Sequence, residues 1–248
     1  MITEVFTFPA RWRAAAAVVA LSLVAGCAES EFGAQASRPT TASERISELR
    51  GDLKRNPNDT VALKEIGDMR ASMGQWGQSM GAYREALLIS PSDREARLGL
   101  GEGQLAVGDY AGALKTVEQA GGKDTRSMLL RAGALAGLDR LTEARAVLTL
   151  AGAAAPRNLD VRINTAIVAA LSRDPQAYAI ARAAAFAPDA NPSHWRNMVL
   201  VGGISGQDTV ARQDALQLGL GSEEIGDILA VGRRARTQGV RAFGVAVG

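Results

Sequence analysis

The feature that most constrains the fold of this chain is an internal repeat. Pro57 and Pro91 lie 34 residues apart, and similar patterns of small and bulky residues occur at matching positions after each of them. Proline has no backbone N–H and ends helices, so each proline is expected to close a helical unit. This period predicts helix-turn-helix units that stack and bury their apolar faces against one another.

The first complete unit is expected to begin at Thr60 and to end before Pro91. A turn at 74–76 separates its two helices. Gly67 on the first helix and Ala86 on the second are small enough for a close crossing, which the bulkier side chains between them can fill. The residues that define this pattern are Leu63, Ile66, Gly67, Trp76, Ser79, Tyr83 and Ala86.

Weaker copies follow along the chain. The second unit starts near Arg94, and the third starts near Thr125, three residues early, where Gly121-Gly122 permits a tighter connection. Residues 159–187 predict a fourth helix pair, and a fifth can be set with Trp195 in its first helix. A helix over 222–237 and one over 43–56, with Ser43 as its N-cap, are expected to close the two ends of the stack.

These units resemble tetratricopeptide repeats, strongly in the first two and loosely beyond Pro156. The resemblance implies an all-α, TPR-like helix-turn-helix solenoid over 43–237, with about four to five helix pairs and terminal capping helices. A composition rich in alanine and leucine with only 4% aromatic residues agrees with closely packed helices. The alternative is a helical bundle without repeats.

The N-terminal segment has the organisation of a secretory signal. Arg11 and Arg13 precede an uncharged apolar run over 14–24, and small residues follow up to Cys27. Eleven residues rise about 16 Å as a helix, roughly half of the hydrocarbon core of a bilayer, which disfavours a permanent membrane span. The sequence therefore predicts a cleaved signal over residues 1–26.

Val24-Ala25-Gly26-Cys27 resembles the lipobox of bacterial lipoproteins. The resemblance implies that Cys27 becomes the lipidated first residue of the mature chain, carrying acyl groups such as palmitate that hold it at a membrane surface. Ala28 is not the aspartate that retains such proteins at the inner membrane, so the expected location is the outer membrane, facing the periplasm. The alternative is an ordinary signal peptide with a chance cysteine. Residues 27–42 are expected to form a flexible tether, and 238–248 a C-terminal tail.

The residue inventory argues against catalysis and nucleic-acid binding. The only cysteine is Cys27 and the only histidine is His194, so a Cys/His zinc cluster cannot form and no nucleophile has an imidazole base beside it. His194 is expected to be a packing or surface residue. Without residues 1–26 the net charge is +1, which gives no basic surface for nucleic acid. We therefore expect no enzyme activity, no metal, no small-molecule substrate and no cofactor apart from the lipid.

The resemblance to tetratricopeptide arrays places particular residues of each first helix on the concave side of the stack. Such a groove would have charged ends and an apolar middle, which suits an extended or helical segment of a protein partner. The same side chains could instead complete the core or face water. The candidates are Lys64, Asp68, Leu98, Glu102, Leu129, Ile163, Ile167, Arg196 and Leu200.

Among lipoproteins with such repeats, the chain resembles the TadD-like proteins of tight-adherence (Flp) pilus assembly. The similarity lies in the early lipobox, in Val161-Arg162-Ile163-Asn164, in His194-Trp195-Arg196-Asn197 and in the helix over 225–236. It implies a scaffold that helps the secretin of a pilus machine to localise or assemble, with a segment of that complex as its partner. Alternatives are a type IV pilotin, an outer-membrane assembly lipoprotein and an adaptor of peptidoglycan enzymes.

Overall fold

The computed structural model describes residues 41–243, and the structural statements below concern this part of the chain. It consists of helices joined by short turns, without a strand, so the predicted all-α class is confirmed. The predicted signal segment and Cys27 lie outside the described residues. The elements are α1 (Ala42–Arg55), α2 (Thr60–Ser72), α3 (Trp76–Ile89), α4 (Arg94–Val107), α5 (Tyr110–Ala120), α6 (Thr125–Gly137), α7 (Leu141–Ala154), α8 (Leu159–Leu171), α9 (Ala177–Ala185), α10 (Pro192–Ser205), α11 (Asp208–Gln217), α12 (Ser222–Gln238) and the 3-10 turn η2 (Gly239–Phe243).

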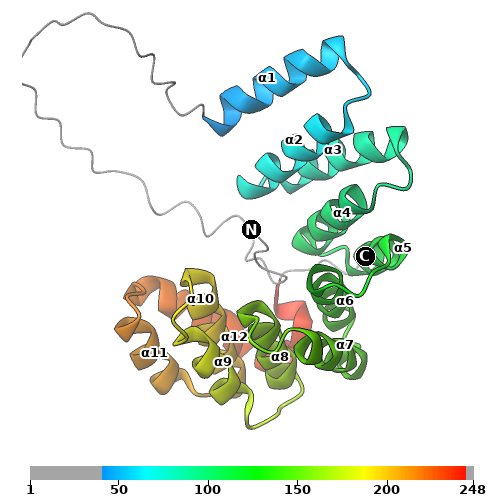
Figure 1. Ribbon diagram of the computed structural model, residues 1–248. Helices are drawn as coiled ribbons and strands as arrows, with labels where there is room; N and C mark the ends of the chain where they lie inside the picture. Colours follow the sequence, from blue (N-terminus) through cyan, green and yellow to red (C-terminus); the bar gives the residue numbers. More distant parts are fainter. Residues whose placement is uncertain (1–40, 244–248) are drawn as a thin grey trace, which may run out of the picture.

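The helices from α2 to α11 form five helix-turn-helix pairs that stack into a curved array (Figure 1). The first helices of the pairs, α2, α4, α6, α8 and α10, contact one another in sequence and lie on the concave side. We call them the inner layer, and the second helices the outer layer. The predicted stack of pairs is therefore present.

Most helices of the inner layer begin where a short polar side chain replaces the missing intrahelical acceptors. Asp59, Asp93, Asp124 and Asn158 each accept a hydrogen bond from a backbone N–H in the first turn of the following helix. Such a cap stabilises a helix by about 1 kcal/mol. The short turns between pairs therefore end at these capping residues, and the next helix begins directly after each of them.

Helix α1 begins two residues earlier than the sequence suggested. Its N-cap is Thr41, not Ser43, because the Thr41 hydroxyl accepts from the Glu44 N–H while the Glu44 carboxylate accepts from the Thr41 N–H. This reciprocal capping box satisfies two orphan donors at once. Ser43 has no glutamate three residues later and lies inside the helix.

Glycine in the inner layer makes room for tyrosine side chains from the outer layer. The ring of Tyr83 on α3 lies between Gly67 on α2 and Gly99 on α4. A Cβ atom at Gly99 would come within 2.3 Å of this ring, and Gly137 stands in the same relation to Tyr110. The prediction that Gly67 permits a close helix crossing is confirmed.

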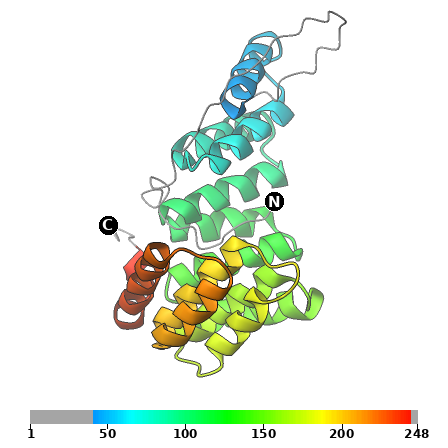
Figure 2. The same cartoon turned by 90° about the vertical axis from the view of Figure 1, so that its left-hand side faces the viewer.

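The C-terminal end of the stack departs from the regular arrangement. Helix α12 packs chiefly on α10 of the inner layer, and η2 then reaches α6. At the crossing, a Cβ on Gly232 would lie 2.7 Å from the Leu200 carbonyl oxygen, so the two backbones nearly touch. Figure 2 shows these orange and red helices gathered at one end of the stack and the blue and cyan helices at the other. We call α12 and η2 together the C-terminal cap.

Within residues 41–243, no helix is both long enough and apolar enough to cross a bilayer. The long buried side chains instead face neighbouring helices, in three core clusters that follow one another along the array.

Candidate partner-binding face

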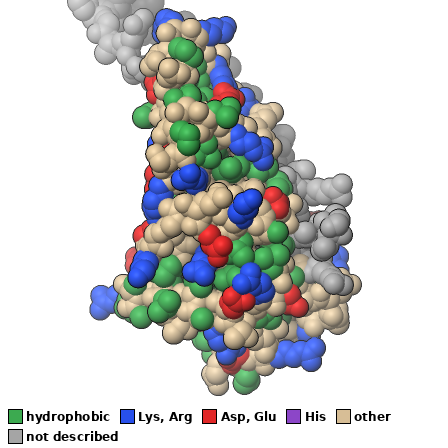
Figure 3. Space-filling model, turned by 90° about the vertical axis from the view of Figure 1, so that its right-hand side faces the viewer, with side chains coloured by type: hydrophobic (Ala, Val, Ile, Leu, Met, Phe, Trp, Pro, Cys, Tyr) green, Lys and Arg blue, Asp and Glu red, His purple; other side chains and the backbone are tan. Residues whose placement is uncertain are grey.

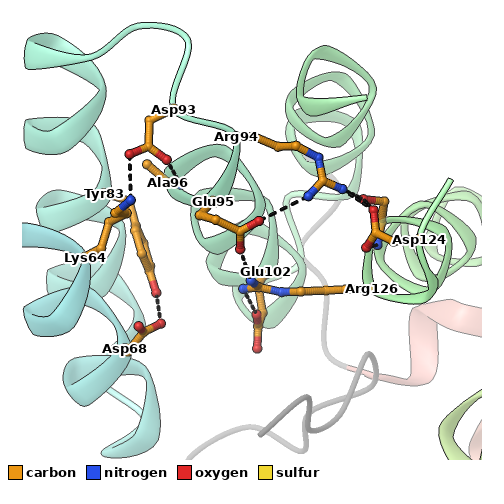
Figure 4. Close-up of polar contacts among 11 residues, drawn as sticks. Lys64, Asp68, Tyr83, Asp93, Arg94, Glu95, Ala96, Glu102, Asp124 and Arg126 are labelled. Atoms are coloured by element: carbon orange, nitrogen blue, oxygen red, sulfur yellow. Dashed lines mark hydrogen bonds and ion pairs between the residues drawn. The ribbon is translucent and has the colours of Figure 1, made fainter. Parts of the chain in front are cut away.

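Charged side chains link the first three pairs across the inner layer (Figure 4). Lys64 Nζ on α2 lies 2.7 Å from Asp93 Oδ2 at the start of α4. Arg126 on α6 donates to Glu102 Oε2 at 3.1 Å and to Glu95 Oε2 at 2.9 Å, both on α4. We call this set the charged ladder; its members are Lys64, Asp68, Asp93, Arg94, Glu95, Glu102, Asp124 and Arg126.

Tyr83 connects the outer layer to this ladder. Its ring passes between Gly67 and Gly99, so the hydroxyl emerges on the inner face and donates to Asp68 Oδ1 at 2.5 Å. Burial and this hydrogen bond raise the pKa of Tyr83. The tyrosine therefore keeps its proton and fixes the position of the Asp68 carboxylate, which itself remains exposed.

The ladder leaves part of its negative charge uncompensated. Burial raises the pKa of Glu102, the Asp68 charge raises it further, and the opposing effect of Arg126 does not restore the ordinary value. Asp93 differs, since the hydrogen bonds from Lys64 and from the Ala96 N–H outweigh its burial and lower its pKa. Asp68 has no lysine or arginine within ion-pair distance in the described part of the chain.

The structure divides the predicted groove residues into three groups, two of them charged and one apolar. Lys64, Asp68 and Glu102 come together on the inner face of α2 and α4, as members of the ladder. Arg196 lies apart on α10, where Glu224 of α12 accepts its hydrogen bond at 2.6 Å. The sequence did not reveal that Glu224 pairs with Arg196 or that Gly232 is where α12 crosses α10.

The apolar middle predicted for the groove is wrong in this structure. The five apolar candidates are 0–1% exposed and belong to the core clusters, so their side chains cannot contact a partner. Neighbouring helices of the inner layer pack closely enough to enclose them, and α12 adds apolar cover at the end of the array. These residues are Leu98, Leu129, Ile163, Ile167 and Leu200.

A second polar cluster lies between α9 and α11. Asp214 is 6% exposed and accepts from Tyr178 Oη at 2.8 Å and from Arg182 Nε at 2.6 Å. Although burial alone would raise the pKa of Asp214, these hydrogen bonds lower it. The buried Asp214 carboxylate is satisfied by Tyr178 and Arg182, so this cluster holds the two helices together.

His194 is a packing residue, as expected. It is 6% exposed, its Nδ1 accepts from the Asn191 N–H, and its Nε2 lies 3.0 Å from Asp160 Oδ1 on the neighbouring helix α8. Within residues 41–243, no group of histidine, cysteine and carboxylate side chains has the arrangement of a metal site.

Comparison with known proteins identifies the architecture but not a family. No protein-family model and no curated protein matches the chain. The solved structures that resemble it include TTC0263, a thermophilic TPR protein of Thermus thermophilus, with 19% identity, 70% of this chain and 98% of that one covered, and a TM-score of 0.61.

Two further structures agree with this assignment. A tetratricopeptide repeat protein from Parabacteroides merdae ATCC 43184 shares 14% identity over 80% of this chain and 87% of its own, with a TM-score of 0.60. MamA from Desulfovibrio magneticus RS-1 shares 19% identity over 58% and 84%, with a TM-score of 0.53. The fold is that of a tetratricopeptide-repeat protein. At these identities the likeness establishes the fold alone.

Proposed function

We propose that this chain is a lipid-anchored scaffold of the bacterial envelope that binds a segment of another protein on its inner face. Cys27 would carry the lipid, and residues up to the start of α1 would connect it to the repeats. The proposed location is the outer membrane, with the repeats facing the periplasm. The protein would act by binding and positioning its partner, without a chemical step.

The observation that supports this proposal best is the inner face of α2, α4 and α6. Stacked repeats expose a continuous curved surface, and a rigid surface of this kind can hold an extended or helical segment. Here the surface bears fixed charges: ion pairs between successive helices and a tyrosine hydrogen bond hold the carboxylates of the ladder in place. A preorganised polar face of this kind suits recognition of another polypeptide.

The machine we propose is the tight-adherence (Flp) pilus, where the scaffold would help the secretin to localise or assemble. Support comes from the sequence features that resemble the TadD-like proteins: the early lipobox, the segments 161–164 and 194–197, and the helix over 225–236. Neighbouring genes for a prepilin, a secretin and a secretion ATPase would favour this machine. Genes for cell-wall hydrolases would favour an adaptor of peptidoglycan enzymes instead.

Mass spectrometry and membrane fractionation test the anchor. We expect the mature chain to begin at an acylated Cys27, and the Cys27→Ala variant to leave the membrane fraction. An Ala28→Asp variant is the matched control: it keeps the cysteine, should stay membrane-bound, and should shift from the outer to the inner membrane. A Cys27→Ala chain that stays in the membrane fraction contradicts the anchor.

Crosslinking in intact envelopes tests the scaffold role. The full chain should form a crosslink to one component of the pilus machine, and disrupting the inner face with an Arg126→Glu substitution should remove it. The matched control is Arg140→Glu on the outer layer, since Arg140 is exposed and, among the described residues, forms an ion pair with Glu143 alone. Crosslinks that survive Arg126→Glu would contradict binding on the inner face.

A further inference from the structure

We propose that the inner face between α2 and α4 receives a lysine or arginine side chain of the partner, held by the carboxylates of Asp68 and Glu102. This inference rests on the proposed function, because it names the chemistry of the segment that the scaffold would bind. It does not depend on the pilus assignment. The surface is defined by Asp68, Glu102 and the Tyr83 hydroxyl that orients the first of them.

The charge balance of the ladder is the first argument. Its cations are Lys64, Arg94 and Arg126, and its five carboxylates are Asp68, Asp93, Glu95, Glu102 and Asp124. The three cations are all engaged by carboxylates of the ladder, and Arg94 and Arg126 are each shared between two of them. The surplus is negative: among the described residues Asp68 forms no ion pair, and Glu102 shares Arg126 with Glu95.

The orientation of the two carboxylates is the second argument. The Tyr83 hydroxyl donates a hydrogen bond to Asp68 Oδ1, and the Arg126 guanidinium donates one to Glu102 Oε2. Among the described residues, no donor is recorded for Asp68 Oδ2 or Glu102 Oε1. Figure 4 shows both carboxylates at the lower edge of the ladder, with the Tyr83 hydroxyl directed at Asp68 and Arg126 at Glu102. A cation placed between them would satisfy both free oxygens and relieve their repulsion.

The other end of the molecule supplies an independent observation. On α10, the inner-face residue Arg196 is neutralised by Glu224, which the amphipathic helix α12 presents at 2.6 Å. Thus α12 packs on the inner layer with a negative side chain, Glu224, opposite the positive side chain of Arg196. At Asp68 and Glu102, on the inner face of α2 and α4, the charge is negative, and no helix of the described chain pairs with it, so the complementary occupant carries a positive side chain.

The outer face gives no comparable signal. Seen from the right-hand side of Figure 1, basic, acidic and apolar side chains are interspersed over the surface (Figure 3). The exposed large apolar residues belong to several helices along the array, Val61 on α2, Leu88 on α3 and Leu150 on α7 among them, and they do not define one docking surface.

A selection from a random-peptide display library tests the proposal. The full chain, embedded through its own anchor in lipid nanodiscs, is the target, beside the double variant Asp68→Asn, Glu102→Gln. Both substitutions keep shape and keep an acceptor for Tyr83 and Arg126 while removing the charge. The control variant is Glu143→Gln, since Glu143 is exposed on α7 and, within residues 41–243, forms an ion pair with Arg140 alone. Circular dichroism verifies that the variants remain helical.

The native chain and the Glu143→Gln control should select peptides that share a lysine or arginine at a fixed position. The affinity of those peptides should fall about tenfold in the double variant, as expected for losing a charge-assisted contact in a partly desolvated site. Replacing the shared cation of the peptide by glutamine should weaken binding to the native chain by a similar factor. It should not weaken binding to the double variant further.

Two outcomes overturn the inference. Peptides without a shared cation that still compete with one another for the inner face would refute the cation site and leave the scaffold role intact. Basic peptides that bind the double variant as tightly as the native chain would show unspecific charge attraction, which also refutes it. If no peptide is selected by the native chain, the cation site and the scaffold role fail together.

Discussion

The inner faces of the two halves of the array differ: the N-terminal one bears charged side chains, and the C-terminal one is packed against α12. In the N-terminal half, α2, α4 and α6 present fixed charges on the concave side, where ion pairs link successive repeats above their apolar core. In the C-terminal half, α12 lies on α10 with a backbone contact at Gly203 and Gly232 and buries Ile225 and Ile228. The same repeat therefore gives an available surface at one end and a closed core at the other.

Two carboxylates show the electrostatic side of this contrast. Asp214, in the C-terminal half, has its pKa lowered by Arg182 and Tyr178 in spite of burial, so its charge is well compensated. Glu102, in the N-terminal half, has its pKa raised because burial and Asp68 outweigh Arg126. A satisfied charge stabilises the fold, whereas an unsatisfied one costs stability and is available to a ligand.

The largest effect should come from separating α12 from α10. A Gly232→Leu substitution would place a side chain against the Leu200 carbonyl and the Gly203 backbone, which cannot move aside as a flexible side chain can. We expect a loss of about 3 kcal/mol or more in the free energy of unfolding, measured by urea denaturation. Hydrogen exchange should accelerate in α10 to α12 before it does so in α2 to α4.

The matched control for that substitution is on the same helix. A Cβ atom added at Gly226 would meet nothing nearer than a guanidinium nitrogen of Arg212, 4.0 Å away, so alanine fits there. Gly226→Ala should raise stability by up to about 1 kcal/mol through helix propensity. Equal losses from both substitutions would show that α12 is not held by the close contact.

The next largest effect should come from Asp214→Asn. We expect it to lower the free energy of unfolding by about 2 kcal/mol near neutral pH, because Arg182 loses its charged partner at a buried site. Since the folded pKa is depressed, the stabilisation is present above the ordinary value of 3.8 and disappears as pH falls through the folded pKa. Urea denaturation against pH should show the two proteins converging in acid. Asp208→Asn, which affects a more exposed pair with Arg233, should change stability much less.

A smaller loss is expected from Tyr83→Phe, about 1 kcal/mol, because the ring still fills the space between Gly67 and Gly99 while the hydrogen bond to Asp68 is lost. The free energy of unfolding measures it. Tyr110→Phe is the control, since the Tyr110 ring packs on Gly137 in the same way and no side-chain hydrogen bond accompanies it within the described part of the chain. Equal losses for the two tyrosines would contradict the role of the Asp68 contact.

The smallest effect, and one of opposite sign, is expected from Glu102→Gln. The folded pKa of Glu102 lies above its ordinary value of 4.5, so the folded chain holds this proton more tightly than the unfolded one. Native stability therefore falls as pH rises from 4.5 through the folded pKa, and the variant should lack this decline. Near neutral pH it should match or slightly exceed the native chain. A clear loss of stability there would mean that Arg126 compensates Glu102 fully.

The sequence predicted the fold well because its signals are local. Proline and aspartate mark the ends of the helices, and the spacing of Gly67, Tyr83 and Pro91 repeats the geometry of one pair. Thr41 was missed as the N-cap because Ser43 is an equally good capping residue by type. Only the spacing distinguishes them: Glu44 lies three residues after Thr41, as a capping box requires, but one residue after Ser43.

The site was predicted only in part because exposure is a property of the assembled stack. Lys64, Asp68 and Glu102 are polar and lie on the inner face, and their contact with a partner stays a prediction. Leu98 and Leu129 occupy corresponding repeat positions, but both are buried. Their burial depends on the packing of adjacent repeats, which the pattern of a single repeat does not show. The placement of α12 depended on a contact between Gly203 and Gly232, which are 29 residues apart.

The most direct test of the division between the halves is photo-crosslinking in intact envelopes from one position in each inner face. A photoreactive residue in place of Ala106, one turn beyond Glu102 on α4, should crosslink to another protein. The same residue in place of Arg196 should crosslink within the chain, to α12. Crosslinks to a partner from position 196, together with none from position 106, would contradict the account.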